Sequence, residues 1–321
     1  MTRGQKLRNC PPEGLVPLGD CNFGGRMIGY LWYRLVEKFA TTVPMRTAYA
    51  VARFLGVLRC RQWRNGRRCV RRNLVVLLGR KAPRRVVRAL VRRTFINFGL
   101  NIIEFFRFPR FDKKYFDAHC EIFGREYLEE ALARGKGAIF LSAHFCNWEW
   151  GVAAYAAQGY RITVIAMPHP REKVERLFVE QRGIKGITVI PTQTAARQAV
   201  RILQQNGILG MLGERMTGKD GVAVNFCGRR VLFPKGPGWM AVKSGAAIIP
   251  TLGIRRKDNT FTIFSAPPIY PPENGSDDEK VLTVTQRFAT FLEQYVKRYP
   301  ELWATFFDFF ARQSAEAGTR N

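Results

Sequence analysis

Beyond residue 120 the chain alternates short apolar runs with amphipathic segments, and this alternation constrains its fold more than any other feature. Five runs have the length and composition of buried strands, namely 138–143, 162–166, 187–190, 208–212 and 247–254. Other segments have the spacing of helices, namely 147–157, 172–182, 192–205, 236–244 and 278–299. Strands that alternate with helices predict an α/β fold with a sheet of parallel or mixed order.

The first third of the chain has a different pattern, which predicts basic amphipathic helices. Residues 27–58 are rich in aromatic and aliphatic side chains, and Pro44 should divide them into two helices. In residues 59–93, apolar positions recur at intervals of three and four among 14 Lys and Arg residues, and a further helical stretch ends near Pro109. No window holds about 20 uncharged apolar residues, so we expect no regular transmembrane helix. Residues 27–58 fit a helix in the membrane interface, or one packed on a core.

The positive charge of the chain is concentrated in this first third. The formal net charge is +27, and residues 1–115 carry 26 Lys and Arg against 5 acids. Such asymmetry indicates a polyanionic partner, either an anionic phospholipid membrane or nucleic acid. The main alternative to an enzyme is therefore a basic nucleic-acid-binding protein without catalysis. The sequence contains no recognisable zinc-finger, RRM or KH pattern, so we expect no nucleic acid partner.

We expect three parts in the chain: a polar N-terminal tail (1–24), a basic amphipathic membrane-docking region (25–115) and an α/β body (116–321). The last two should pack together as one unit. The seven cysteines are scattered and form no C-x-x-C pair, which argues against a zinc finger and a disulfide framework and predicts reduced thiols.

One histidine stands in a segment that could perform chemistry, Gly137 to Gly151. The strand at 138–143 should place His144 at the carboxyl end of the sheet, where open α/β sheets bind ligands. Asn147 could cap the next helix, and Glu149 in its first turn could reach back to the imidazole. A histidine polarised by a carboxylate is a general base for a hydroxyl, although a purely structural histidine would also fit this pattern. A serine or metal hydrolase is disfavoured, because the segment has no G-x-S-x-G elbow and no second nearby histidine.

The stretch Ala143-His-Phe-Cys-Asn-Trp-Glu149 resembles the H-x4-(D/E) signature of glycerolipid acyltransferases, in the H-x-G-N-W-E form of the lipid A late (secondary) acyltransferase family. The likeness extends in collinear order over about 25–312. Its further blocks are Arg71-Arg-Asn-Leu74, Glu180-Gln-Arg182-Gly183, Gly210-Met-Leu-Gly-Glu-Arg215, Gly221–Gly228, Ser244–Pro250 and Tyr299–Trp303. Two positions depart from the pattern, since Cys146 replaces the usual glycine and Glu214 stands where aspartate is common.

The resemblance implies a mixed sheet flanked by helices, like that of glycerol-3-phosphate acyltransferase. It also implies acyl transfer from an acyl-carrier-protein (ACP) or coenzyme A (CoA) thioester to a hydroxyl of a glycolipid, without a metal or other cofactor. His144 would accept the hydroxyl proton and Glu149 would balance the imidazolium charge. The expected acceptor is a lipid A precursor, with other phosphorylated glycolipids and aminolipids left open. The expected location is the cytoplasmic face of the bacterial inner membrane, in a peripheral or monotopic state.

Five further residues are candidates for substrate binding. Arg182, Arg215 and Arg229 could bind phosphate groups of the donor or acceptor, because the guanidinium fork matches phosphate geometry. Glu214 could orient one of these arginines or bind sugar hydroxyls, and a buried ion pair is its alternative role. Asn147, beside His144, is the fifth candidate.

Overall fold

The body of the protein is built on a seven-stranded mixed sheet. The computed structural model describes residues 25–218 and 220–314, so the expected tail 1–24 lies outside the described residues. The strands are β1 (Cys120–Phe123), β2 (Ala138–Ser142), β3 (Ile162–Ala166), β4 (Thr188–Pro191), β5 (Ile208–Leu212), β8 (Ala247–Arg255) and β9 (Phe261–Ser265). Their order in the sheet is β1-β9-β8-β2-β5-β3-β4. Strands β8, β2, β5, β3 and β4 are mutually parallel, and β9 runs antiparallel to β8. The predicted mixed α/β fold is confirmed.

All five predicted strands are present, whereas the two edge-side strands β1 and β9 and a separate hairpin were not predicted. The hairpin consists of β6 (Gly221–Phe226) and β7 (Arg229–Pro234). Its two-residue turn, Cys227-Gly228, has φ angles of 53° and 70°. Two positive φ values are typical of a type I′ turn, which usually carries Asn-Gly, so a cysteine at the first position gives little sequence signal.

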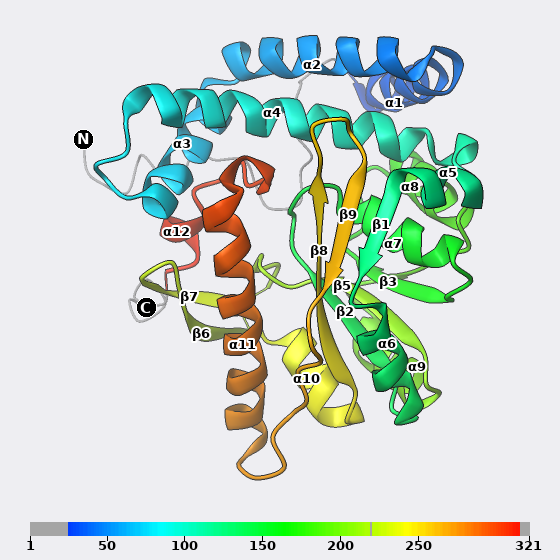
Figure 1. The fold of residues 1–321 in the computed structure, drawn as a ribbon, viewed down its shortest axis with the longest axis vertical. Coiled ribbons are helices and arrows are strands. Elements are labelled where there is room, and N and C mark those ends of the chain that lie inside the picture. Colours follow the sequence, from blue (N-terminus) through cyan, green and yellow to red (C-terminus); the bar gives the residue numbers. More distant parts are fainter. Residues whose placement is uncertain (1–24, 219, 315–321) are drawn as a thin grey trace.

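Helices flank the sheet, and a long helix near the C-terminus runs beside the hairpin (Figure 1). They are α5 (Lys113–His119), α6 (Arg125–Ala133), α7 (Trp148–Ala157), α8 (Glu172–Gly183), α9 (Ala195–Gln204), α10 (Gly236–Ser244), α11 (Asp277–Arg298) and the short α12 (Phe309–Arg312). Helix α11 begins with a capping box in which Ser276 and Glu279 satisfy each other's backbone N–H groups. Its Gln286 and Glu293 accept hydrogen bonds from the hairpin backbone.

Four helices make up the basic N-terminal region: α1 (Gly25–Thr42), α2 (Met45–Gln62), α3 (Arg64–Leu78) and α4 (Arg84–Phe106). The predicted break at Pro44 is confirmed. The basic stretch 59–93 is not one helix, because the chain turns at Gly79, with φ 81°, and α4 starts directly after Pro83. Proline fixes its own φ and disfavours a helical conformation for the residue before it, which places the boundary here.

Helix α4 lies across the end of the sheet toward which β8 points, and α2 lies along its outer side (Figure 1). Glycines permit this close packing: a Cβ atom on Gly56 of α2 would lie 2.8 Å from the Cα atom of Ile96. Among the described helices, none is long and apolar enough to cross a membrane.

Candidate active site

The sheet brings His144 and Glu214 together. Strands β2 and β5 are adjacent and parallel, and their last residues, Ser142 and Leu212, are partners in the register. His144 and Glu214 each stand two residues beyond these ends, so both leave the sheet at the same point of its carboxyl edge. The prediction that β2 delivers His144 to this edge is confirmed. The pairing with Glu214 was not predicted, since it depends on the strand order.

The two side chains form a tight pair. Oε1 of Glu214 lies 2.8 Å from Nδ1 of His144 and also accepts the backbone N–H of His144 at 2.9 Å. Glu214 is completely buried, whereas the His144 side chain retains 23% of its exposure. A carboxylate can only accept hydrogen bonds, so we assign the imidazole proton to Nδ1. Nε2 then carries the free lone pair, which is the arrangement that a general base requires.

The local electrostatics keep this pair in its reactive form. Burial lowers the pKa of His144, and the positive charge of Arg215 lowers it further, against the opposing effect of Glu214. Burial would raise the pKa of Glu214, but attraction to His144 and Arg215 and hydrogen bonds from His144 lower it to about 2. At neutral pH the imidazole is therefore neutral and the carboxylate is charged.

Glu149 does not make the contact predicted for it. Its carboxylate accepts two hydrogen bonds from Arg182, from Nε at 3.0 Å and from Nη2 at 2.7 Å, and one from the indole of Trp148 at 3.2 Å. The prediction that Glu149 holds the imidazole is corrected here, since Glu214 occupies that position. Nε and Nη2 of Arg182 are thus bound by Glu149, and its role in phosphate binding stays a prediction.

Asn147 is also corrected as a substrate-binding residue. Its side chain is buried, Oδ1 accepts the N–H of Trp150 at 3.1 Å, and Nδ2 donates to Glu104 at 2.7 Å. Both ends of the amide are thus engaged within the protein. The prediction that Asn147 caps helix α7 is confirmed.

The remaining two arginines lie in different places. Nε of Arg215 is 3.3 Å from Glu214, and its Nη2 donates to the carbonyl of Ala304 at 2.5 Å, so Arg215 belongs to the His144 site. Arg229 begins strand β7 and lies over the ring of Phe310. Together with Arg80 and Arg230 it lines a cavity of about 500 Å³ between α3 and the hairpin turn.

The turn that carries His144 is held by the C-terminal segment. Ala304 donates to the carbonyl of His144, and Cys146 donates to the carbonyl of Leu302, both at 2.8 Å. Cys146 has φ 52°, in the left-handed region that glycine adopts without cost. This conformation gives the usual glycine of the H-x-G-N-W-E pattern a physical reason.

Within the described residues, no group of three His, Cys, Asp or Glu side chains is placed to hold a metal ion. The five described cysteines are free thiols.

Comparison with known proteins finds relatives that are named as acyltransferases. Phosphatidylinositol mannoside acyltransferase of Mycolicibacterium smegmatis is 27% identical over 300 residues, which cover 91% of this chain and 92% of the relative. The protein of the same name from Mycobacterium tuberculosis is 26% identical over 73% of this chain and 74% of its own length. A solved structure, the 1-acyl-sn-glycerophosphate acyltransferase PlsC from Thermotoga maritima, aligns with a TM-score of 0.36 and 17% identity, over 84% of this chain and 98% of that one.

The family match decides between the two functions considered from the sequence. Residues 26–312 match the bacterial lipid A biosynthesis acyltransferase family, which includes nearly all of the described chain. The alternative of a basic protein without catalysis is therefore wrong. The chain is an acyltransferase, and it belongs to the bacterial lipid A biosynthesis acyltransferase family.

Proposed function

We propose that this enzyme moves a fatty acyl chain from an acyl-ACP or acyl-CoA thioester to a sugar hydroxyl of a glycolipid, with His144 as the general base. The observation that carries this proposal is the pairing of His144 Nδ1 with the buried carboxylate of Glu214 at 2.8 Å. It leaves Nε2 basic and partly exposed, and it places a fixed negative charge beside the imidazolium that forms during the reaction.

The steps follow from this geometry. Nε2 of His144 removes the proton of the acceptor hydroxyl while the hydroxyl oxygen attacks the thioester carbonyl. Glu214 stabilises the resulting imidazolium. When the tetrahedral intermediate collapses, the C–S bond breaks and the imidazolium returns its proton to the departing thiolate. The thioester is already activated, so the reaction needs no covalent acyl-enzyme and no metal or other cofactor.

The acceptor we propose first is a phosphatidylinositol mannoside or a similar phosphorylated glycolipid. Both relatives described above are named for acting on this acceptor class, whereas a lipid A precursor is indicated only by the name of the family. We also propose that the cavity with Arg80, Arg229 and Arg230 binds an anion, because its lining residues include several guanidinium groups and no carboxylate.

We further propose that helices α1 and α2 lie on an anionic phospholipid membrane. Their outer surface exposes large apolar side chains, with Leu31, Leu35 and Phe54 retaining 56%, 58% and 68% of their exposure. The exposed basic residues Arg34 and Lys38 lie on the same helix as Leu31 and Leu35. Apolar side chains between basic ones suit the headgroup region, where each Lys or Arg contributes about 1 kcal/mol. The enzyme would then act at the cytoplasmic face of the inner membrane, in a peripheral or monotopic state.

Transfer of a labelled acyl chain tests the catalytic proposal. Purified enzyme is given acyl-CoA or acyl-ACP with a phosphatidylinositol mannoside or a lipid A precursor, and products are identified by mass spectrometry. We expect one new acyl ester in the presence of the mannoside and none with His144→Ala. His119→Ala is the matched control, since that imidazole stacks on Tyr115 in α5 and should leave transfer unchanged. Substantial transfer by folded His144→Ala would contradict the proposal.

Sedimentation with anionic vesicles tests the membrane proposal. Serine at Leu31, Leu35 and Phe54 should weaken vesicle binding at least about tenfold, because the variant lacks three apolar side chains that would be transferred from water into the membrane. The control carries serine at three exposed apolar positions on other elements, which are Val179, Ile184 and Leu282. Equal binding by the two triple variants would show that α1 and α2 are not the docking surface.

A further inference from the structure

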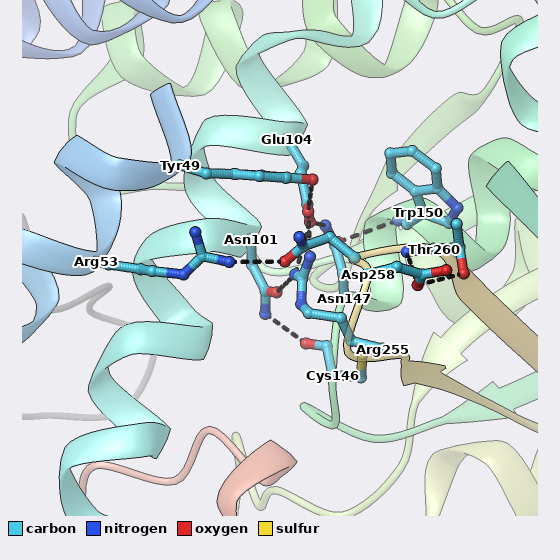
Figure 2. Close-up of polar contacts among 11 residues, drawn as sticks. Tyr49, Arg53, Asn101, Glu104, Cys146, Asn147, Trp150, Arg255, Asp258 and Thr260 are labelled. Atoms are coloured by element: carbon cyan, nitrogen blue, oxygen red, sulfur yellow. Dashed lines mark hydrogen bonds and ion pairs between the residues drawn. The ribbon is translucent and has the colours of Figure 1, made fainter. Parts of the chain in front are cut away.

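A buried polar cluster joins helix α4 to the turn that carries His144 (Figure 2). Its centre is an ion pair between Glu104 of α4 and Arg255 at the end of β8, both almost completely inaccessible to water. Nη2 of Arg255 donates to Glu104 Oε2 at 2.8 Å, and Nη1 donates to Oε1. The hydroxyl of Tyr49, from α2, also donates to Oε1 at 2.6 Å. None of these groups takes part in the proton transfer described above.

Two contacts connect this ion pair to the turn. Nδ2 of Asn147 donates to Glu104 Oε2 at 2.7 Å. Asn101, one helical turn before Glu104, accepts from Arg255 Nη2 at 2.9 Å and donates to the carbonyl of Cys146. We call Asn101, Glu104 and Arg255 the α4 anchor. The anchor thus holds two consecutive residues of the turn, one by its backbone and one by its side chain.

The turn is strained and is held by two sets of contacts. Cys146 keeps a left-handed conformation that non-glycine residues adopt only where the surroundings impose it. The segment 302–304 binds the backbone of His144 and Cys146, as described above. The α4 anchor binds the backbone of Cys146 and the side chain of Asn147. The position of the turn therefore depends on both sets of contacts.

The turn position controls the catalytic pair directly. Oε1 of Glu214 accepts hydrogen bonds from both the backbone N–H and Nδ1 of His144, at 2.9 and 2.8 Å. Since the backbone N–H moves with the turn, a displacement of the turn changes the bond from this N–H and also shifts the Cα atom that carries the imidazole. The anchor is buried, so a charge or amide in it that lost its partner would be left without a hydrogen bond at a high free-energy cost. This cost keeps the anchor side chains in their observed contacts.

We propose that the α4 anchor is a positioning device for acyl transfer: Asn101, Glu104 and Arg255 fix the strained turn 144–147 so that His144 stays aligned with Glu214. The inference rests on the proposed function of His144. In this proposal α4 contributes to catalysis although it does not contact the reacting atoms. Tyr49 extends the same hydrogen-bonded cluster to α2.

Two variants remove the anchor's hold on the turn while they leave the Glu104–Arg255 ion pair intact. Asn101→Leu replaces the amide by an apolar group of similar size and deletes the bond to the Cys146 carbonyl. Asn147→Ser keeps an oxygen that can cap α7, because serine is a preferred N-cap, but its shorter arm does not reach Glu104. Tyr155→Phe is the matched control: it deletes a buried hydrogen bond from α7 to Ser265, at 2.8 Å, that lies outside the turn.

The measurements separate positioning from general destabilisation. At a temperature where all variants are folded by circular dichroism, we expect kcat of Asn101→Leu and Asn147→Ser to fall about tenfold to a hundredfold. The KM values for donor and acceptor should stay within about twofold of wild type. Tyr155→Phe should lose thermal stability with kcat unchanged. Wild-type kcat in both turn variants would overturn the proposal, and Asn147→Ser decides alone if Asn101→Leu does not fold.

A second readout does not depend on turnover. The Nδ1 proton of His144, hydrogen-bonded to a buried carboxylate, should give a far-downfield proton resonance that His144→Ala removes. Asn101→Leu and Asn147→Ser should weaken or shift this resonance, whereas Tyr155→Phe should retain it. If the wild type transfers no acyl chain, the proposed function fails, and the resonance still decides whether the anchor aligns His144. An unchanged resonance in both turn variants would refute the positioning role.

Discussion

Replacement of Glu214 by glutamine tests which carboxylate serves the catalytic histidine. In the transition state His144 becomes a cation, and the carboxylate of Glu214 lies 2.8 Å from its Nδ1 atom. With the two charge centres roughly 4 Å apart and an effective dielectric constant of about 20, their attraction is about 4 kcal/mol. Loss of that attraction corresponds to a fall in kcat of about 10³-fold. The glutamine amide can also donate to Nδ1, which would favour the tautomer that leaves Nε2 protonated and unable to act as a base.

Glu149→Gln is the comparison variant, because it removes the carboxylate that the His-x4-Glu spacing suggests. Glu149 binds Arg182, so this change leaves a buried guanidinium without a counter-charge and should cost about 3–5 kcal/mol of stability. Its effect on kcat should be smaller than that of Glu214→Gln by at least about tenfold.

The assay is initial-rate acyl transfer at saturating donor and acceptor, at pH 7 and below the melting temperature of each variant. Thermal unfolding is measured on the same preparations. We expect Glu214→Gln to lose mainly turnover and Glu149→Gln to lose mainly stability. A folded Glu214→Gln enzyme with kcat within about tenfold of wild type, or a larger kcat loss in Glu149→Gln, would refute the assignment of Glu214.

Two further predictions concern the same turn. Because burial and Arg215 lower the pKa of His144, the neutral base should persist below the ordinary imidazole value, and the acid limb of kcat/KM should have its midpoint below pH 6.5. Glu214→Gln should move that midpoint to still lower pH, since the attraction that raises the pKa is lost; a move to higher pH would contradict this sign. Cys146→Gly should leave the free energy of unfolding within about 1 kcal/mol of wild type. Glycine removes the strain of the left-handed conformation, and this gain offsets the greater conformational entropy that glycine gives the unfolded chain. Cys146→Val, whose β-branched side chain fits that conformation poorly, should lose about 2 kcal/mol or more in chemical denaturation.

Sequence reasoning identified strands that form short apolar runs, including the edge strand β4, but it missed β9, which is almost completely buried. Residues 138–142 and 208–212 form nearly continuous apolar runs because each strand has a neighbour on both sides and helices above and below. Strand β1, at the sheet edge, alternates half-buried and exposed residues over four positions and has no apolar run comparable to the one that marks the other edge strand, β4. The hairpin was missed because its turn lacks the usual Asn-Gly pair.

In the N-terminal helical region, too, the accuracy of the prediction depended on local sequence signals. Pro44 was correctly predicted as a helix boundary, because proline acts on its own neighbours. The turn at Gly79 and Pro83 was overlooked within a basic stretch whose three- and four-residue spacing continues on both sides of it. Periodicity identified the type of element there, but it did not indicate where one helix ends and the next begins.

The wrong carboxylate partner has a more general cause. Glu149 is five residues from His144 in sequence, whereas Glu214 is 70 residues away and becomes adjacent only because β5 pairs with β2. Sequence spacing identifies residues on one element, but the order of strands decides which elements are neighbours.

Glu149 nevertheless contributes to the site at longer range. Its negative charge raises the pKa of His144 slightly, while Arg182 neutralises most of that charge. The two carboxylates therefore act on the imidazole in different ways. Glu214 contacts it directly and sets its tautomer, whereas Glu149 acts only through its electrostatic field, which the charge of Arg182 weakens. Removal of Glu149 and Arg182 together should then disturb catalysis less than removal of either one, because neither buried charge is left uncompensated.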